Sequence, residues 1–198
     1  SNVGACKVGT VSGTSISFGA QSNFNTHSTY IRLSFDPNTS GKFVVVYRNN
    51  DNSNYGTASL GTVSSTSISY GTAAIFNSAS TLFTDVAFNP NTANQFVAVY
   101  RDNGNSNYGT ANIGSVSGTS ISYNSPTVFN AGNTNNIYID FASNISNAFV
   151  ISYADADNSS YGTAITGSVA GTSLSFNTEA VFKSASINYS EMSTTPDG

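Results

Sequence analysis

A block of 23 residues occurs four times along this chain without an internal gap, at residues 3–25, 55–77, 108–130 and 161–183. The two middle copies are YGTASLGTVSSTSISYGTAAIFN and YGTANIGSVSGTSISYNSPTVFN. The glycines of the four copies lie 52, 53 and 53 residues apart, at Gly4, Gly56, Gly109 and Gly162. A repeat of this kind is one supersecondary unit that buries its apolar surface against its neighbours.

The repeats divide the chain into regular units. We expect a single repeat domain over residues 1–198, because a chain of this length is long enough for one domain with its own core. Its parts are a partial repeat at 1–25, full repeats at 26–77, 78–130 and 131–183, and a second partial repeat at 184–198.

Each full repeat is predicted to form four short strands separated by turn residues. The first strand lies at 31–35, 84–88 and 137–141, with a further copy at 187–194. The second strand is the most apolar segment, with the sequences FVVVY at 43–47, FVAVY at 96–100 and FVISY at 149–153. A five-residue run of β-branched and aromatic residues without polar alternation indicates a strand that is buried on both faces.

The third strand begins at each Tyr-Gly-Thr, and a short link containing Ser and Gly leads into a fourth strand, Thr-Ser-Ile-Ser-aromatic. Two-residue links that contain Gly mark hairpins. We therefore predict an all-β fold, a β-propeller-like array of four-stranded antiparallel blades of about 53 residues, with three to four blades represented.

Two other architectures are less consistent with this pattern. The coils of a β-solenoid are usually shorter than this repeat, and four strands are too few for a β-sandwich domain. The 187–194 copy of the first strand has no second strand after it in this sequence. Either the chain is cut from a longer array, which we favour, or a four-bladed ring closes with one incomplete blade.

Composition narrows the kind of partner. Charged residues make up 8% of the chain, against about 25% in ordinary globular proteins, while 13 Phe and 11 Tyr supply core material. The net charge is −4 and the six basic residues are scattered, so nucleic acid is not an expected partner. No apolar run approaches the 18 residues of a membrane-spanning helix, so membrane insertion is not expected either.

The loop before each third strand is the candidate ligand site. Amide side chains there supply paired donors and acceptors for sugar hydroxyls, and tyrosine offers an apolar face to a sugar ring. The same residue types also hold turns, which is the structural alternative. The candidate ligand-binding residues are Asn52, Asn54, Tyr55, Asn105, Asn107, Tyr108, Asn158, Ser160 and Tyr161.

The sequence offers little for metal binding or catalysis. Asp155 and Asp157 form a weak calcium candidate, because Ca²⁺ loops need several oxygen ligands and no glutamate completes the set here. His27 is the one histidine, and we interpret it as a solvent-exposed linker residue. No cofactor is expected, and we predict that the protein is not an enzyme.

The segments FVVVYR, NSNYGTA, GTVSGTSISF and VFN together resemble repeat arrays in large proteins of marine bacteria and their tailed phages. In those proteins the arrays look like parts of tail fibres, virion surface proteins or secreted adhesins. The resemblance implies a module located extracellularly or on a virion surface, with neighbouring subunits or further blades as its partners.

Two functional hypotheses follow. In the first, the chain is a non-enzymatic structural or adhesion module of a virion or extracellular fibre, with a capacity for host-receptor binding. In the second, it is a multivalent lectin-like propeller that binds cell-surface glycan with one weak site per blade, at the Asn-Ser-Asn-Tyr-Gly loops.

Overall fold

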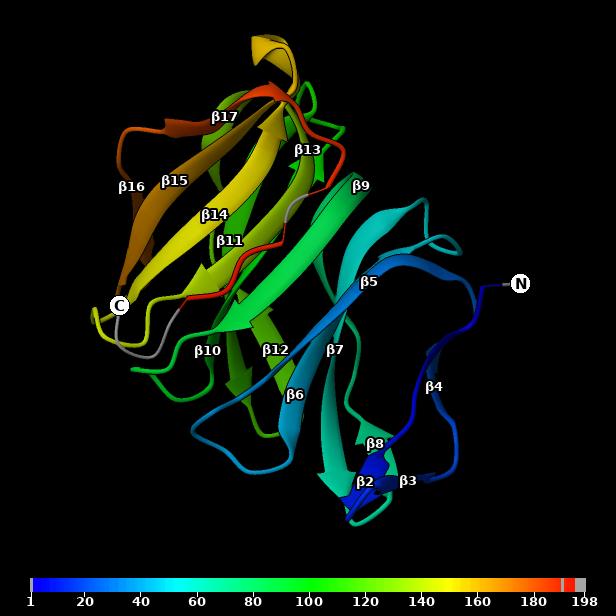
Figure 1. The fold of residues 1–198 in the computed structure, drawn as a ribbon. Helices are drawn as coiled ribbons and strands as arrows, with labels where there is room; N and C mark the ends of the chain where they lie inside the picture. The colour runs from blue at the N-terminus through cyan, green and yellow to red at the C-terminus, as the bar shows by residue number, and fades with distance from the viewer. Residues whose placement is uncertain (1, 190, 195–198) are drawn as a thin grey trace.

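A computed structural model describes residues 2–189 and 191–194, and it is an all-β structure with antiparallel strand pairing (Figure 1). The helical content of these residues is a single short turn, η1 (Ala156–Asn158). Within the same ranges no helix has the length and apolar character needed to cross a membrane. The predicted fold class is therefore confirmed at the level of an antiparallel all-β protein.

The strands follow the repeats in order. The N-terminal partial repeat holds β1 (Gly4–Cys6), β2 (Gly9–Ser12), β3 (Ser15–Phe18) and β4 (Ser22–Asn25). The first full repeat contains β5 (Ser28–Phe35), β6 (Lys42–Asn49), β7 (Tyr55–Ser64) and β8 (Ser67–Tyr70). The second contains β9 (Ala74–Phe88), β10 (Gln95–Asp102), β11 (Tyr108–Ser117) and β12 (Ser120–Tyr123). The third contains β13 (Thr127–Phe141), β14 (Ala148–Asp155), β15 (Tyr161–Ala170), β16 (Ser173–Phe176) and β17 (Ala180–Ser186).

Strands β9 and β13 are each 15 residues long and join one repeat to the next. The first part of β9 pairs with β7 of the preceding repeat, with Ala74 opposite Ala58. The second part of β9 pairs with β10 of its own repeat, with Val86 opposite Ala98. The sequence predicted the second part alone. The first part was missed because the ten-residue β7 holds two partners in succession, β8 beside its end and β9 beside its start.

The predicted copy of the first strand at 187–194 is wrong over the residues described there. Residues 187–189 and 191–194 are not strand. In the three full repeats the first strand pairs with the second strand of its own repeat, and residues 187–189 and 191–194 have no such partner among the described residues. The end of the segment still lies beside β13, where the backbone N–H of Thr194 donates to Asp140 Oδ2 over 2.7 Å.

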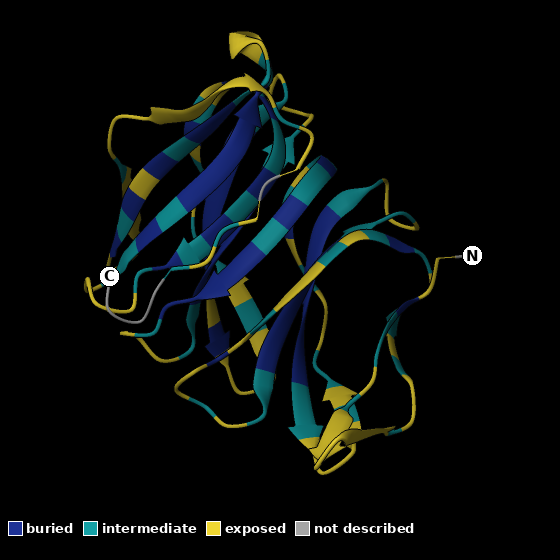
Figure 2. Cartoon of the chain, viewed as in Figure 1, coloured by how far each residue is buried: buried dark blue, intermediate teal, exposed yellow. Residues whose placement is uncertain are grey.

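The apolar second strands form the centre of the core, as predicted. All residues of 43–47 and 96–100 are 2% exposed or less, and in 149–153 one residue, Val150, is half-buried. Alternate side chains of β10 face different repeats: Phe96, Ala98 and Tyr100 pack with the first repeat, while Val97 and Val99 pack with the third. Figure 2 shows this buried band along the long strands, in contrast to the exposed β2 and β3.

An aromatic cluster of five rings recurs between successive repeats. Between the first and second full repeats the ring centroids of Phe76 and Tyr100 lie 5.0 Å apart, those of Phe96 and Tyr123 lie 5.8 Å apart, and Phe88 lies 5.4 Å from Phe96. Tilted and edge-on contacts at these distances are favourable for aromatic rings. The same contacts recur in the sets Phe24, Phe35, Phe43, Tyr47, Tyr70 and Phe129, Phe141, Phe149, Tyr153, Phe176.

The recurring glycines allow these rings to approach the backbone. A Cβ atom at Gly56 would lie 2.3 Å from the ring of Phe76, and one at Gly114 would lie 2.1 Å from the ring of Phe96. Real Cβ atoms do not approach so closely, so the aromatic clusters need glycine at these positions. The repeated Tyr-Gly-Thr motif therefore reflects packing between repeats.

Candidate functional site

The predicted ligand loops are tight turns. In the first two loops the N–H of the tyrosine donates to the carbonyl oxygen three residues earlier, from Tyr55 to Asn52 over 2.9 Å and from Tyr108 to Asn105 over 3.0 Å. Ser53 and Asn54, the central residues of the first turn, both have positive φ, at 51° and 62°. Positive φ at both central positions defines a type I′ turn, which explains the Asn and Ser residues of the loop.

Each loop is also tied to the start of the next repeat. The carbonyl oxygens of Asn54, Asn107 and Ser160 accept hydrogen bonds from the N–H groups of Thr81, Thr134 and Ile187, over 3.0, 3.1 and 3.0 Å. The structure thus gives these loops a role in joining repeats. Of the predicted ligand residues, Asn52, Asn105 and Asn158 are exposed, whereas Asn54, Tyr55, Asn107, Tyr108, Ser160 and Tyr161 are half-buried. Sugar binding by the loops stays a prediction.

The two aspartates of the calcium candidate bind backbone N–H groups. Asp155 Oδ1 accepts from the N–H of Asp157 over 3.2 Å, and Asp157 Oδ2 accepts from the N–H of Asn133 over 3.0 Å. Over residues 2–189 and 191–194, no group of three or more His, Cys, Asp or Glu side chains is placed to hold a metal ion. These carboxylates therefore have a structural role in the third loop.

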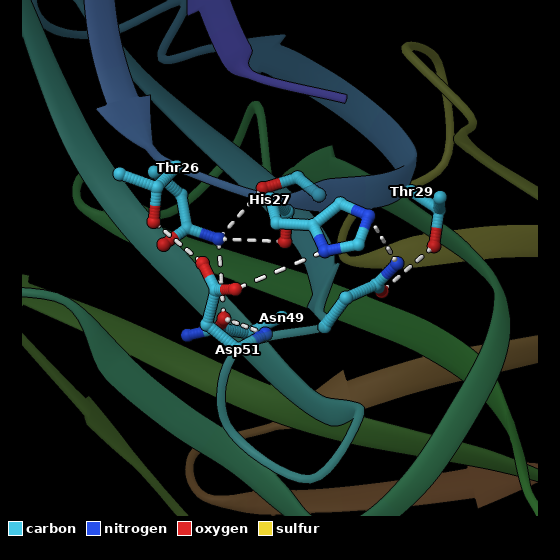
Figure 3. Close-up of polar contacts among 8 residues, drawn as sticks. Thr26, His27, Thr29, Asn49 and Asp51 are labelled. Carbon is cyan, nitrogen blue, oxygen red and sulfur yellow. Dashed lines mark hydrogen bonds and ion pairs between the residues drawn. The ribbon is translucent and has the colours of Figure 1, made fainter. Parts of the chain in front are cut away.

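A polar network surrounds the first loop (Figure 3). His27 Nδ1 lies 3.8 Å from Asp51 Oδ1, and the hydroxyl of Thr26 donates to the other oxygen of Asp51 over 2.5 Å. The amide of Asn25 donates to the hydroxyl of Ser28 and to Asn49 Oδ1. The equivalent amides of Asn77 and Asn130 bind Thr81 and Thr134 in the same way. His27 is partly exposed, as predicted, but it belongs to this network that closes the repeat.

The first strand of each full repeat carries a β-bulge that the sequence analysis did not find. In β5, two residues, Tyr30 and Ile31, lie opposite the single residue Tyr47. The leading bulge residues Tyr30, Phe83 and Asn136 have φ values of 51°, 49° and 50°. Bulky residues rarely adopt this left-handed conformation, and bulges redirect side chains next to functional sites.

The three bulges surround one hollow of about 230 Å³, here called the bulge pocket. Its lining residues come from all three full repeats and from the C-terminal segment: Tyr30, Arg32, Phe83, Thr84, Asn136, Ile137, Tyr138 and Tyr189. Tyr30, Phe83, Asn136 and Tyr189 occupy the same repeat position, each 53 residues after the last. The fold therefore brings four distant but equivalent residues to one place.

Cationic and aromatic side chains meet at this pocket. The rings of Tyr30 and Phe83 lie 5.4 Å apart in an edge-on arrangement. The guanidinium carbon of Arg101 lies 4.9 Å from the centroid of Phe83, and that of Arg32 lies 5.7 Å from the centroid of Tyr138. Both distances allow cation–π attraction. Arg101 is also fixed by the amide oxygens of Asn103 and Asn135.

Asp85 is a half-buried carboxylate beside the pocket. Its Oδ2 atom accepts a hydrogen bond from the N–H of Ile139 over 3.0 Å, linking β9 to β13. Burial raises the pKa of Asp85 to about 6, and the backbone N–H groups of Ile139 and Val86 and the charge of Arg32 oppose this rise. The carboxylate therefore pairs adjacent first strands at an electrostatic cost.

One signal in the sequence could have revealed the pocket. The position held by Leu33, Val86, Ile139 and Met192 stays apolar in every repeat. The position just before it holds Arg32, Asp85, Tyr138 and Glu191, four different side chains. Variation at one position of an otherwise regular repeat indicates a surface that packing does not constrain.

No protein-family model matches this chain, and neither does any curated protein.

Proposed function

We propose that the chain is a non-enzymatic structural and adhesion module of an extracellular or virion surface, and that its repeats are propeller-like blades around an axis through the bulge pocket. The aromatic cluster that recurs between successive repeats carries this proposal. It supports a module that is extended by adding identical interfaces, which suits fibres and surface arrays.

A second observation supports the radial arrangement. Equivalent residues of successive repeats line one hollow, whereas the equivalent residues of a straight rod would follow one another along its length. The guanidinium of Arg32 even reaches the ring of Tyr138, which belongs to the repeat after next. Blades around a common axis account for both contacts.

Small-angle X-ray scattering tests the arrangement. A compact array of 198 residues should give a radius of gyration of about 16 Å. A clearly larger value at infinite dilution, with the scattering profile of a rod, would contradict the propeller-like arrangement.

Beads that carry the chain are incubated with a glycan array, which tests the adhesion role. In parallel they are incubated with chromogenic ester, glycoside and phosphate substrates, which tests the non-enzymatic assignment. We expect no turnover of any substrate. Turnover that persists after repurification and is lost in Arg32→Gln would contradict the non-enzymatic assignment.

The alternative function is multivalent glycan binding with one weak site at each turn loop. The exposed amides of Asn52, Asn105 and Asn158 favour it, because each stands at the same place in its repeat. Under this alternative, Tyr108→Ala should lower bead retention on the array by more than the loss of one independent site, since binding is multivalent. Unchanged retention would exclude the loops as the contact.

A further inference from the structure

At the bulge pocket, equivalent positions of the repeats carry different chemistry. Its four equivalent leading positions hold Tyr30, Phe83, Asn136 and Tyr189, while the aromatic clusters keep their residue types from repeat to repeat. Packing explains the constancy of the clusters, but it does not explain an arginine, an amide and four aromatic rings around one hollow. Such a mixture is typical of a ligand site.

The shape and walls of the pocket fit a single sugar ring. Its volume of about 230 Å³ is below the roughly 300–1,000 Å³ of sites for drug-sized ligands. Tyr138 and Tyr189 provide ring faces and hydroxyls, and Asn136 provides an amide. Tyrosine combines an apolar face with a polar tip, and a sugar likewise has an apolar C–H face and polar hydroxyls.

Arg32 adds a preference for negative charge. Its guanidinium is exposed, lies over Tyr138 and donates one hydrogen bond, to the carbonyl oxygen of Ile31 over 3.1 Å. In the part of the chain that the structure describes, it forms no ion pair. The nearby carboxylate of Asp85 is held by the N–H of Ile139. Arginine binds a carboxylate through two parallel hydrogen bonds, so the free N–H groups of Arg32 suit a carboxylate ligand.

The backbone holds these side chains in place. The bulges keep Tyr30, Phe83 and Asn136 at φ near 50°, and the hydroxyl of Thr84 binds the carbonyl oxygen of Tyr30 in the neighbouring repeat. A non-glycine residue in this conformation costs about 1–3 kcal/mol, and such strain concentrates at functional sites. The pocket is thus formed before any ligand arrives.

We propose that the bulge pocket binds a single sugar ring that carries a carboxylate, with Arg32 on the carboxylate and Tyr30, Tyr138 and Tyr189 around the ring. This inference rests on the proposed adhesion role and names the class of ligand for it. It places the contact at the centre of the repeat array and not at the turn loops.

The test is a titration with glucuronate at low salt, in which ¹H–¹⁵N NMR chemical shifts report binding. Glucose, which has the same ring without the charge, is the control. We expect the shifts to gather on residues of the first strands, among them Thr84 and Ile137. A charge-assisted hydrogen-bond pair should make glucuronate bind roughly tenfold more tightly than glucose. Arg32→Gln should remove that difference, and Lys183→Gln, which removes an exposed charge outside the pocket, should leave it intact.

A second variant distinguishes loss of binding from loss of the fold. Tyr189 is 82% exposed, so Tyr189→Ala should leave the fold unchanged while weakening the binding of both sugars severalfold. Equal affinity of the wild type for glucose and glucuronate would overturn the assignment of Arg32. Absence of binding for both, or shifts confined to the turn loops, would overturn the site itself. Neither result would affect the scattering test of the repeat arrangement, so the two proposals fail separately.

Discussion

Two parts of the molecule contain equivalent residues in opposite environments. One is the interface between the first two full repeats. The other is the N-terminal face, which the first full repeat and the partial repeat before it form. Phe88 is 5% exposed at the interface, and its equivalent Phe35 is 55% exposed at the face. Val116 is 9% exposed, whereas Val11 is 72% exposed. The sequence at these positions is nearly the same, so the burial of a residue depends on the repeat beside it.

The difference arises from the second strand of the preceding repeat. At the interface, Val44 and Val46 of β6 cover the side chains of the second repeat. Residues 2–25 contain no such strand, and an apolar hollow of about 330 Å³ lies there between Cys6, Val8, Leu33 and Phe43. A repeat interface is therefore completed by the second strand of the preceding repeat and not by the hairpins alone.

The largest effect should come from the interface core. Phe96 is fully buried and contacts two rings of its aromatic cluster. Phe96→Ala should lower the free energy of unfolding by about 3–5 kcal/mol, as for buried phenylalanines in general. The matched change Phe18→Ala, at a ring that is 65% exposed, should lower it by less than about 1 kcal/mol. Similar urea midpoints for the two variants would contradict the comparison.

The next effect concerns charge at equivalent positions. Arg32 is exposed on the first full repeat, while Asp85 at the same position of the second full repeat has a pKa raised to about 6 by burial. Between about pH 4 and pH 6 the folded state keeps a proton that the unfolded state releases, so stability should fall as pH rises through this window. The loss should reach about 2–3 kcal/mol and be absent in Asp85→Asn. Urea titrations at several pH values would measure it, and parallel curves for both proteins would contradict it.

A third comparison uses one substitution at two equivalent glycines. A Cβ at Gly114 would lie 2.1 Å from the Phe96 ring, whereas one at Gly9 would meet Ile16 Cδ1 at 3.3 Å. Gly114→Ala should cost about 1–3 kcal/mol through overpacking, and Gly9→Ala should change stability by about 0.5 kcal/mol or less. Thermal unfolding followed by circular dichroism would measure both. Equal losses would mean that the N-terminal partial repeat is packed as tightly as the interface between the first two full repeats.

The smallest effect is expected in the turn loops. Asn107 ties its repeat to the next through its carbonyl oxygen, which alanine retains. Asn107→Ala should therefore cost about 1 kcal/mol or less, and Asn107→Gly should cost less still, since φ is 64° there. A loss comparable to that of Phe96→Ala in urea titration would show that the amide side chain supports the loop.

The local sequence predicted the strands that depend on local patterns. The buried second strands, the third strands and the hairpins with Ser-Gly links all appear at the expected residues. The missed first half of β9 and the wrong strand at 187–194 share one cause. Whether a segment becomes a strand there depends on its pairing partner: β9 has β7, whereas 187–194 has no second strand beside it among the described residues.

The sequence alone determined the repeat, its length and the residues that fill its core, because periodic spacing and apolar runs are local properties. The tertiary structure alone decided which equivalent residues are buried and that Tyr30, Phe83, Asn136 and Tyr189 meet around one pocket. These four residues are spread over 160 positions, from 30 to 189. Only the stacking of repeats, through contacts that no local pattern encodes, brings them together.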